Sequence, residues 1–149
     1  MANPLTLLMP LVPNTNPLVI AQTVASHQAA INVALTSIGT VHFARFAVFD
    51  ASVPNLQPSG KPGDNLVLGV ITEYDNDFDT YIADFVNKIG FIFDALLPFV
   101  VGGPPLVPVA SNLVTFTAFV KANDASQAPG APGLYSAYPY SVQQILANG

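Results

Sequence analysis

The stretch from Thr40 to Asp50, TVHFARFAVFD, constrains the fold more than any other part of the chain. Its β-branched and aromatic residues predict a strand, in which successive side chains point to opposite faces. Strict alternation puts Arg45 on one face, with Val41, Phe43, Ala47 and Phe49, and puts His42 on the other. Because a buried guanidinium without a partner costs several kcal/mol, we expect this single arginine to have an acidic neighbour.

A second strand is predicted at Leu66–Tyr74, LVLGVITEY, after a Pro-, Gly- and Ser-rich loop from Ala51 to Asn65. We expect the two strands to pair in antiparallel fashion. If the residues at the two ends of the loop form the last pair, Glu73 lies diagonally across from Arg45 on the same face. Glu73 would then be the partner that Arg45 needs, and His42 would lie near Tyr74.

The remaining elements follow from periodicity and from capping residues. Strands are predicted at Pro4–Met9 and at Asn112–Lys121, and helices at Pro17–Ser37 and at about Asp77–Leu97. A short final helix is predicted from Ser141.

The resulting order is β-α-β-β-α-β, which predicts an α+β, ferredoxin-like fold with a four-stranded antiparallel sheet and two helices on one face. Residues 1–122 would form this domain, and residues 123–149 a connector and tail helix that pack on it or on a partner. Charged residues are only 9% of the chain and hydrophobic residues 51%. Because so few charges cannot cover a bare sheet face, we expect a homodimer or a higher homo-oligomer.

Composition excludes several classes of function. The chain has no cysteine, so disulfides and the common zinc sites are excluded, and no metal site is expected. A net charge of −5 without a Lys/Arg cluster argues against nucleic acid as a partner. The DNDFD run is not a calcium loop, because Thr80 and Val86 replace the required glycine and glutamate. Two spans of the chain are uncharged, residues 1–44 and residues 95–120, and prolines interrupt both. We therefore expect no membrane segment and a cytoplasmic location.

Three segments, TVHFARFAVFD, LVLGVITEYDNDFDTYIADF and LYSAYPYSV, resemble a little-described family of bacterial ferredoxin-like proteins. The element order is also similar to that of the dimeric α+β barrels, in which two sheets close face to face. That superfamily includes cofactor-independent monooxygenases and haem-dependent peroxidases. In the haem proteins the resemblance implies a helix histidine as proximal ligand and a strand arginine on the distal side, roles that only His27 and Arg45 could take here. The GxxDG motif of the peroxidases is absent.

His27 lies on the apolar stripe of the first predicted helix, so two interpretations are open. It is either a core histidine bonded to a backbone carbonyl, or a haem ligand or pocket base.

Three functions follow from these residues. The first is a small-molecule binding protein or a cofactor-independent, monooxygenase-like enzyme, whose cavity near Arg45 and Glu73 holds a partly apolar ligand. Arg45, His42 and Glu73 would be its catalytic residues, with His42 as general base, and Phe43, Phe46 and Tyr74 would bind the ligand. The second is a haem-binding peroxidase-like protein that uses His27 and Arg45. The third is a structural or assembly protein without a ligand, in which Arg45 and Glu73 fix the strand register.

Overall fold

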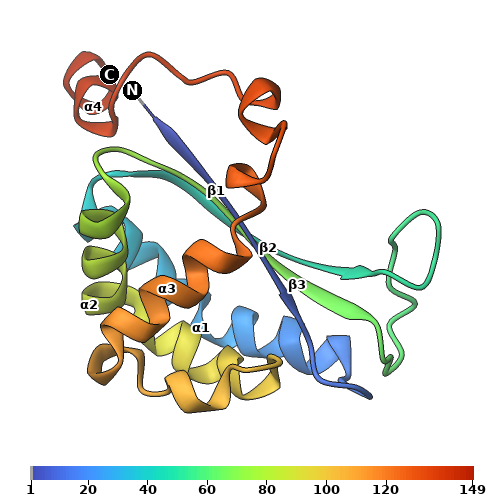
Figure 1. The fold of residues 1–149 in the computed structure, drawn as a ribbon. Coiled ribbons are helices and arrows are strands. Elements are labelled where there is room, and N and C mark those ends of the chain that lie inside the picture. Colours follow the sequence, from blue (N-terminus) through green and yellow to red (C-terminus); the bar gives the residue numbers. More distant parts are fainter. Residues whose placement is uncertain (1) are drawn as a thin grey trace.

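A computed structural model describes residues 2–149 and shows an α+β fold around a three-stranded antiparallel sheet (Figure 1). The strands β1 (Asn3–Pro10), β2 (Val41–Asp50) and β3 (Leu66–Tyr74) lie in the order β1-β3-β2. The two long helices, α1 (Pro17–Ile38) and α2 (Phe78–Leu96), pack against one face of this sheet. A shorter helix, α3 (Leu113–Asn123), lies beside α2, and the chain ends in α4 (Val142–Asn148).

Helix α1 begins and ends where its capping residues predict. The side chain of Asn16 accepts a hydrogen bond from the Leu18 amide at 3.0 Å, and Pro17 occupies the first helical position. Gly39 ends the helix with a φ of 70°, a left-handed conformation that glycine adopts without steric cost.

Helix α2 begins at Asp77, whose carboxylate accepts hydrogen bonds from the Thr80 amide at 2.9 Å and the Thr80 hydroxyl at 2.7 Å. These bonds to the backbone and side chain of Thr80 lower the pKa of the exposed Asp77. Asp77 is therefore the N-cap residue of the helix that the sequence predicts at about Asp77–Leu97.

A row of aromatic rings crosses the core between the sheet and the helices. Tyr74 of β3 stacks on Tyr81 at 4.0 Å between ring centroids, and Tyr81 contacts Phe85 at 5.5 Å. Phe93 then contacts Phe85 at 5.5 Å and Phe116 of α3 at 5.1 Å. Such ring pairs add to the free energy of apolar burial, so this row joins β3, α2 and α3 into one core.

The prediction of a fourth strand at Asn112–Lys121 is wrong, because this segment forms α3 and the sheet has three strands. Its many Thr, Val and Phe residues favour a strand by propensity. The residues that it buries, Phe116 and Val120, are nevertheless four positions apart, which is helical spacing. The fold is therefore not the predicted four-stranded ferredoxin-like arrangement, and the predicted closure of two such sheets into a dimeric α+β barrel does not apply.

The free edge of β1 is occupied by a carboxylate and a short turn. One oxygen of Asp124, Oδ1, accepts a hydrogen bond from the Thr6 amide at 3.0 Å, and Leu7 forms an isolated bridge with Asp124. The Ser126 hydroxyl donates to the Pro4 carbonyl at 3.2 Å. These hydrogen bonds pair some of the backbone amide and carbonyl groups of β1 that would otherwise be free to pair with another strand.

The second face of the sheet, here named the open sheet face, carries no helix (Figure 1). Phe43 and Arg45 are exposed on it, and its other side chains are mostly half-buried. By register and alternation it consists of Pro4, Thr6 and Leu8 from β1, Phe43, Arg45, Ala47 and Phe49 from β2, and Val67, Gly69, Ile71 and Glu73 from β3.

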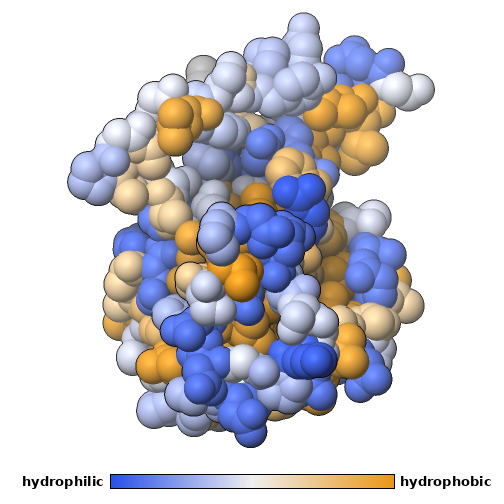
Figure 2. Space-filling model, turned by 90° about the vertical axis from the view of Figure 1, so that its right-hand side faces the viewer, coloured by the Kyte–Doolittle hydropathy of each residue, from blue (hydrophilic) through white to orange (hydrophobic). Residues whose placement is uncertain are grey.

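Other apolar residues also reach the surface. Figure 2 shows them as separate orange patches among hydrophilic residues. Helix α1 contributes Leu18, Val19 and Val33 to the exposed large hydrophobic residues. By length and composition alone this helix could cross a membrane, a test that core helices of soluble proteins and signal sequences near the N-terminus also pass.

Candidate functional site

Arg45 and Glu73 lie on the same face of the sheet, as the sequence predicts. Arg45 pairs with Ile71 and Phe43 with Glu73, so the two charged residues are diagonal neighbours on the open sheet face. Within residues 2–149 neither forms a salt bridge. Because Arg45 is exposed, water satisfies its charge, and the expectation of a buried guanidinium is wrong.

His42 lies at a bulge that breaks the alternation of β2. Val41 pairs with Tyr74, yet Phe43 pairs with its sequence neighbour Glu73, so His42 is the extra residue. As a consequence Val41 turns to the helix side, where it is 8% exposed, and does not share a face with Arg45 as strict alternation predicts.

The acidic partner of His42 is Asp75. The His42 Nε2 atom lies 2.9 Å from Asp75 Oδ1, and Asp75 Oδ2 accepts the amide of Val142 at 2.8 Å. The His42 ring also meets Tyr138 edge-on at 6.2 Å. These contacts attach the start of α4 to the ends of β2 and β3, which gives His42 a structural role in the tail.

His27 bonds to a backbone carbonyl, as the first of its two interpretations predicts, but it is half-buried and does not belong to the core. Its Nδ1 lies 2.7 Å from the carbonyl oxygen of Thr23, and its ring stacks on Phe91 at 5.7 Å. Since α1 packs on one face of the sheet and Arg45 projects from the other, the sheet lies between His27 and Arg45. The two side chains of one chain therefore cannot bracket a single haem, and this arrangement lends the haem hypothesis no support.

The three residues expected to bind a ligand lie in three different places. Phe43 is 43% exposed on the open sheet face, whereas Phe46 points to the helix side. Tyr74 is buried in the aromatic row, and burial, with smaller contributions from the charges of Asp124 and Asp77, raises its pKa to about 12. The structure does not bring Phe43, Phe46 and Tyr74 together with Arg45 and Glu73 in one cavity.

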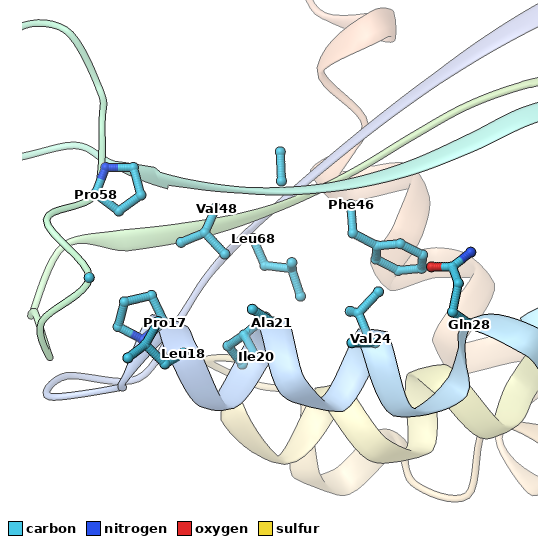
Figure 3. A pocket seen from close by; sticks show the side chains of 13 residues that line it. Pro17, Leu18, Ile20, Ala21, Val24, Gln28, Phe46, Val48, Pro58 and Leu68 are labelled. Atoms are coloured by element: carbon cyan, nitrogen blue, oxygen red, sulfur yellow. The ribbon is translucent and has the colours of Figure 1, made fainter.

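Phe46 instead lines an apolar cavity of about 490 Å³ between α1 and the sheet. The cavity is open to solvent on the α1 side, where its lining residues Leu18, Ala21, Ala25 and Gln28 are exposed. In Figure 3, Pro17 and Pro58 lie at one end, and Gln28 and Phe46 at the other. The lining is almost entirely aliphatic: Pro17, Leu18, Ile20, Ala21, Val24, Ala25, Gln28, Phe46, Ala47, Val48, Pro58, Gly60 and Leu68.

The cavity exists because α1 does not close fully onto β2. Ala21 and Ala25 are the small residues of α1 in the cavity lining, and the loop after β2 contributes Pro58 and Gly60 to the same lining. Small side chains at facing positions leave a gap that larger residues would fill. We refer to this space as the α1–β2 cavity.

Gln28 is the one polar side chain of the lining. Its Nε2 donates a hydrogen bond to Asn32 Oδ1 at 3.0 Å, which orients the amide. The Gln28 carbonyl oxygen makes no hydrogen bond within residues 2–149, so it can accept one from a bound molecule. No charged residue lines this cavity, so it favours uncharged, largely apolar molecules.

Comparisons of the chain with protein-family models, with curated proteins and with solved structures found no match. The resemblance inferred from the sequence is not tested by these comparisons and stays a prediction.

The cavity was missed in the sequence because its lining looks like ordinary core. Val24 belongs to the apolar stripe that predicts α1 to be a packed helix, and Phe46 and Val48 belong to a regular strand. The available signal was the pair Ala21 and Ala25, small residues one helical turn apart on α1.

Proposed function

We propose that this protein binds a small, uncharged and mainly apolar molecule in the α1–β2 cavity. The observation that carries the proposal is an aliphatic cavity of about 490 Å³ with a single polar side chain, Gln28, at one end. Specific ligand sites commonly combine an apolar lining with a few polar groups that fix orientation. A molecule with an aliphatic body and one terminal hydroxyl matches this combination of an apolar lining and a single polar side chain.

The proposal is a binding function and contains no reaction. Arg45, His42 and Glu73, the residues from which catalysis was expected, do not line the α1–β2 cavity. Phe46 is the one member of the predicted set that does. The proposed ligand is therefore still small and partly apolar, but its proposed binding site lies on the other face of the sheet.

A series of linear alkanols tests the proposal. Each methylene removed from water contributes about 0.8 kcal/mol, so affinity should rise about fourfold per added carbon while the chain still fits. We expect hexanol, heptanol and octanol to displace the neutral dye Nile red in this order of increasing affinity. Dye that is not displaced, or alkanol affinity that does not change with chain length, would contradict the proposal.

A cavity-filling variant supplies the matched control. Ala21→Trp places a large side chain in the α1–β2 cavity, whereas Ala122→Trp places the same side chain at an exposed position of α3. Only Ala21→Trp should abolish Nile red binding. Because the natural chain has no tryptophan, energy transfer from the new residue to the dye also reports where the dye binds. Equal loss in both variants would show that the dye binds elsewhere.

A second candidate function, assembly through the open sheet face, has an observation of its own. Arg45 and Glu73 are of opposite charge, lie on adjacent strands and form no salt bridge within residues 2–149. In a two-fold symmetric pair, Arg45 of each copy can meet Glu73 of the other, while the apolar residues around them are buried. A homodimer of this kind would cover Phe43, which is now 43% exposed.

Sedimentation velocity of charge variants tests the assembly. Arg45→Glu or Glu73→Arg alone should shift a dimer toward monomer, because each puts like charges together, and the double exchange should restore the dimer. Lys61→Glu, in the exposed loop, is the matched control and should leave the dimer intact. A natural protein that stays monomeric at high concentration would contradict this candidate.

A further inference from the structure

A second, polar pocket of about 520 Å³ lies where β3 ends and α2 begins. It shares no residue with the α1–β2 cavity. Its lining comes from β1, β3, the start of α2, the end of α3 and the turn after it: Asn3, Tyr74, Asn76, Asp77, Phe78, Lys121, Asp124 and Gln127. We refer to it as the Tyr74–Asp124 pocket.

Two deeply buried side chains present unused polar atoms to this pocket. Tyr74 is 5% exposed, and its hydroxyl makes no hydrogen bond among the described residues. Asp124 is 7% exposed, and its bonds from Thr6 and Ser126 all go to Oδ1. The second carboxylate oxygen, Oδ2, has no donor within residues 2–149. No buried side-chain nitrogen or oxygen of the described residues lacks a hydrogen-bond partner, so these two atoms are open to the pocket, where a bound molecule can replace the water that satisfies them.

The unpaired atoms define which chemical groups a bound partner would need. A carboxylate oxygen can only accept hydrogen bonds, and a tyrosine hydroxyl can accept as well as donate. The Tyr74 hydroxyl is neutral at physiological pH, as is usual for tyrosine, and burial raises its pKa further, to about 12. The partner must therefore supply several N–H or O–H donors close together.

The charges around the pocket favour a cation. Asp77 and Asp124 are both part of the lining, whereas its one cation, Lys121, already forms a salt bridge of 2.9 Å with Asp79. The negative charge of Asp124 therefore has no partner of opposite sign within 4 Å among residues 2–149. A carboxylate in a mostly buried residue attracts a positive group more strongly than one in bulk water, because the surrounding dielectric is lower.

An aromatic wall completes the site. Phe78 meets Tyr74 edge-on at 6.4 Å, and the Lys121 ammonium lies 5.2 Å from the centre of the Phe78 ring. The pocket thus already accommodates one ammonium group over an aromatic face, an arrangement that stabilises cations. The same ring offers an apolar surface to the hydrocarbon part of a ligand.

We propose that the Tyr74–Asp124 pocket binds a small organic ammonium ion. Its N–H groups donate to Asp124 Oδ2 and to the Tyr74 hydroxyl, and its short hydrocarbon body packs against Phe78. Neither the Nile red experiment nor the alkanol series addresses this site, so the two proposals stand or fall separately.

Three ligands of equal length test the chemistry. The full-length protein, labelled with ¹⁵N, is titrated with n-butylammonium, n-butanol and n-butyrate while amide shifts are recorded. We expect n-butylammonium alone to shift the amides around Asn76, Asp77 and Asp124 in a saturable manner. Binding of n-butanol with equal affinity, or no saturable shift with n-butylammonium at tens of millimolar, would overturn the proposal.

Two conservative variants test the residues. Tyr74→Phe keeps the ring that stacks on Tyr81 and removes only the hydroxyl, so binding of n-butylammonium should weaken about tenfold. Asp124→Asn keeps an oxygen for Thr6 but removes the charge, and the loss should be at least as large. Tyr140→Phe, at an exposed tyrosine outside the pocket, is the control and should change nothing.

The outcomes separate a recognition site from a general charge effect. A Tyr74→Phe protein that binds n-butylammonium as tightly as the natural protein would overturn the role of the hydroxyl and with it the proposed site. If Asp124→Asn fails to fold, the Tyr74→Phe result and the comparison with n-butanol still decide the question.

Discussion

Replacing Asp124 with alanine tests whether a carboxylate holds the free edge of the sheet. Its Oδ1 atom accepts hydrogen bonds from the Thr6 amide at 3.0 Å, the Ser126 amide at 3.0 Å and the Ser126 hydroxyl at 2.6 Å. Bonds to a charged acceptor contribute about 1.5–3 kcal/mol each, although the two Ser126 donors can turn to water when the acceptor is lost. We expect Asp124→Ala to lower the free energy of unfolding by about 3 kcal/mol, a large part of the roughly 5–15 kcal/mol of a typical domain.

Urea denaturation followed by circular dichroism measures this loss. With a slope of about 2 kcal/mol per M, the midpoint should fall by about 1.5 M. Asp79→Ala is the control, because Asp79 is exposed and its ion pair with Lys121 contributes less than about 1 kcal/mol. A midpoint shift for Asp124→Ala no larger than that for Asp79→Ala would refute the reasoning. Asp124→Asn, which keeps an acceptor, should fall between the two.

Three further predictions concern the tail, the core and the buried tyrosine. Asp75→Ala removes the acceptor of both His42 and the Val142 amide, so amide hydrogens of α4 should exchange faster, as mass spectrometry would show. Phe93→Ala interrupts the aromatic row and should cost about 3–5 kcal/mol of unfolding free energy in urea. The pKa of Tyr74 is raised from 10.0 to about 12, so this residue contributes to the free energy of unfolding below pH 10, and the contribution is lost as pH rises to about 12. Tyr74→Phe should therefore make the decline of the unfolding free energy over this pH interval shallower.

Each of these predictions has a result that contradicts it. Unchanged exchange of α4 in Asp75→Ala would show that other contacts hold the tail. A cost below about 1 kcal/mol for Phe93→Ala would mean that the core collapses around the gap. An identical alkaline profile in Tyr74→Phe would show that this tyrosine does not titrate differently in the folded and unfolded protein.

Much of the fold was predictable because local signals were strong. Asn16, Asp77 and Ser141 mark helix starts through side chains that bond to free amides, and the structure has all three caps. The strand Leu66–Tyr74 and its antiparallel pairing with β2 are also confirmed, and with them the diagonal placement of Arg45 and Glu73. These features depend on neighbouring residues, which a sequence displays directly.

The errors arose where distant contacts outweigh local preference. The β-branched residues of Asn112–Lys121 favour a strand, yet burial of Phe116 against Phe93 makes this segment a helix. The bulge at His42 could not be seen in the sequence, because the contacts of this residue are with Asp75 and, through Asp75, with the distant tail.

The site was misplaced for a related reason. A lone arginine in an apolar strand suggests a buried charge, but the face that carries Arg45 has no helix over it, and the residue is exposed. The α1–β2 cavity depends on how closely α1 approaches β2, a distance that no periodicity encodes. The helix caps confirm the elements, but they do not fix that distance.

The most direct test of the binding proposal is to map octanol on the ¹⁵N-labelled protein by amide shifts. The account predicts saturable shifts for α1 residues from Leu18 to Gln28 and for Phe46 to Val48 of β2, with none around Asn76 and Asp77. Loss of these shifts in Ala21→Trp, but not in Ala122→Trp, would locate the ligand in the α1–β2 cavity. Shifts confined to other parts of the protein, or no saturable shift at all, would contradict the account.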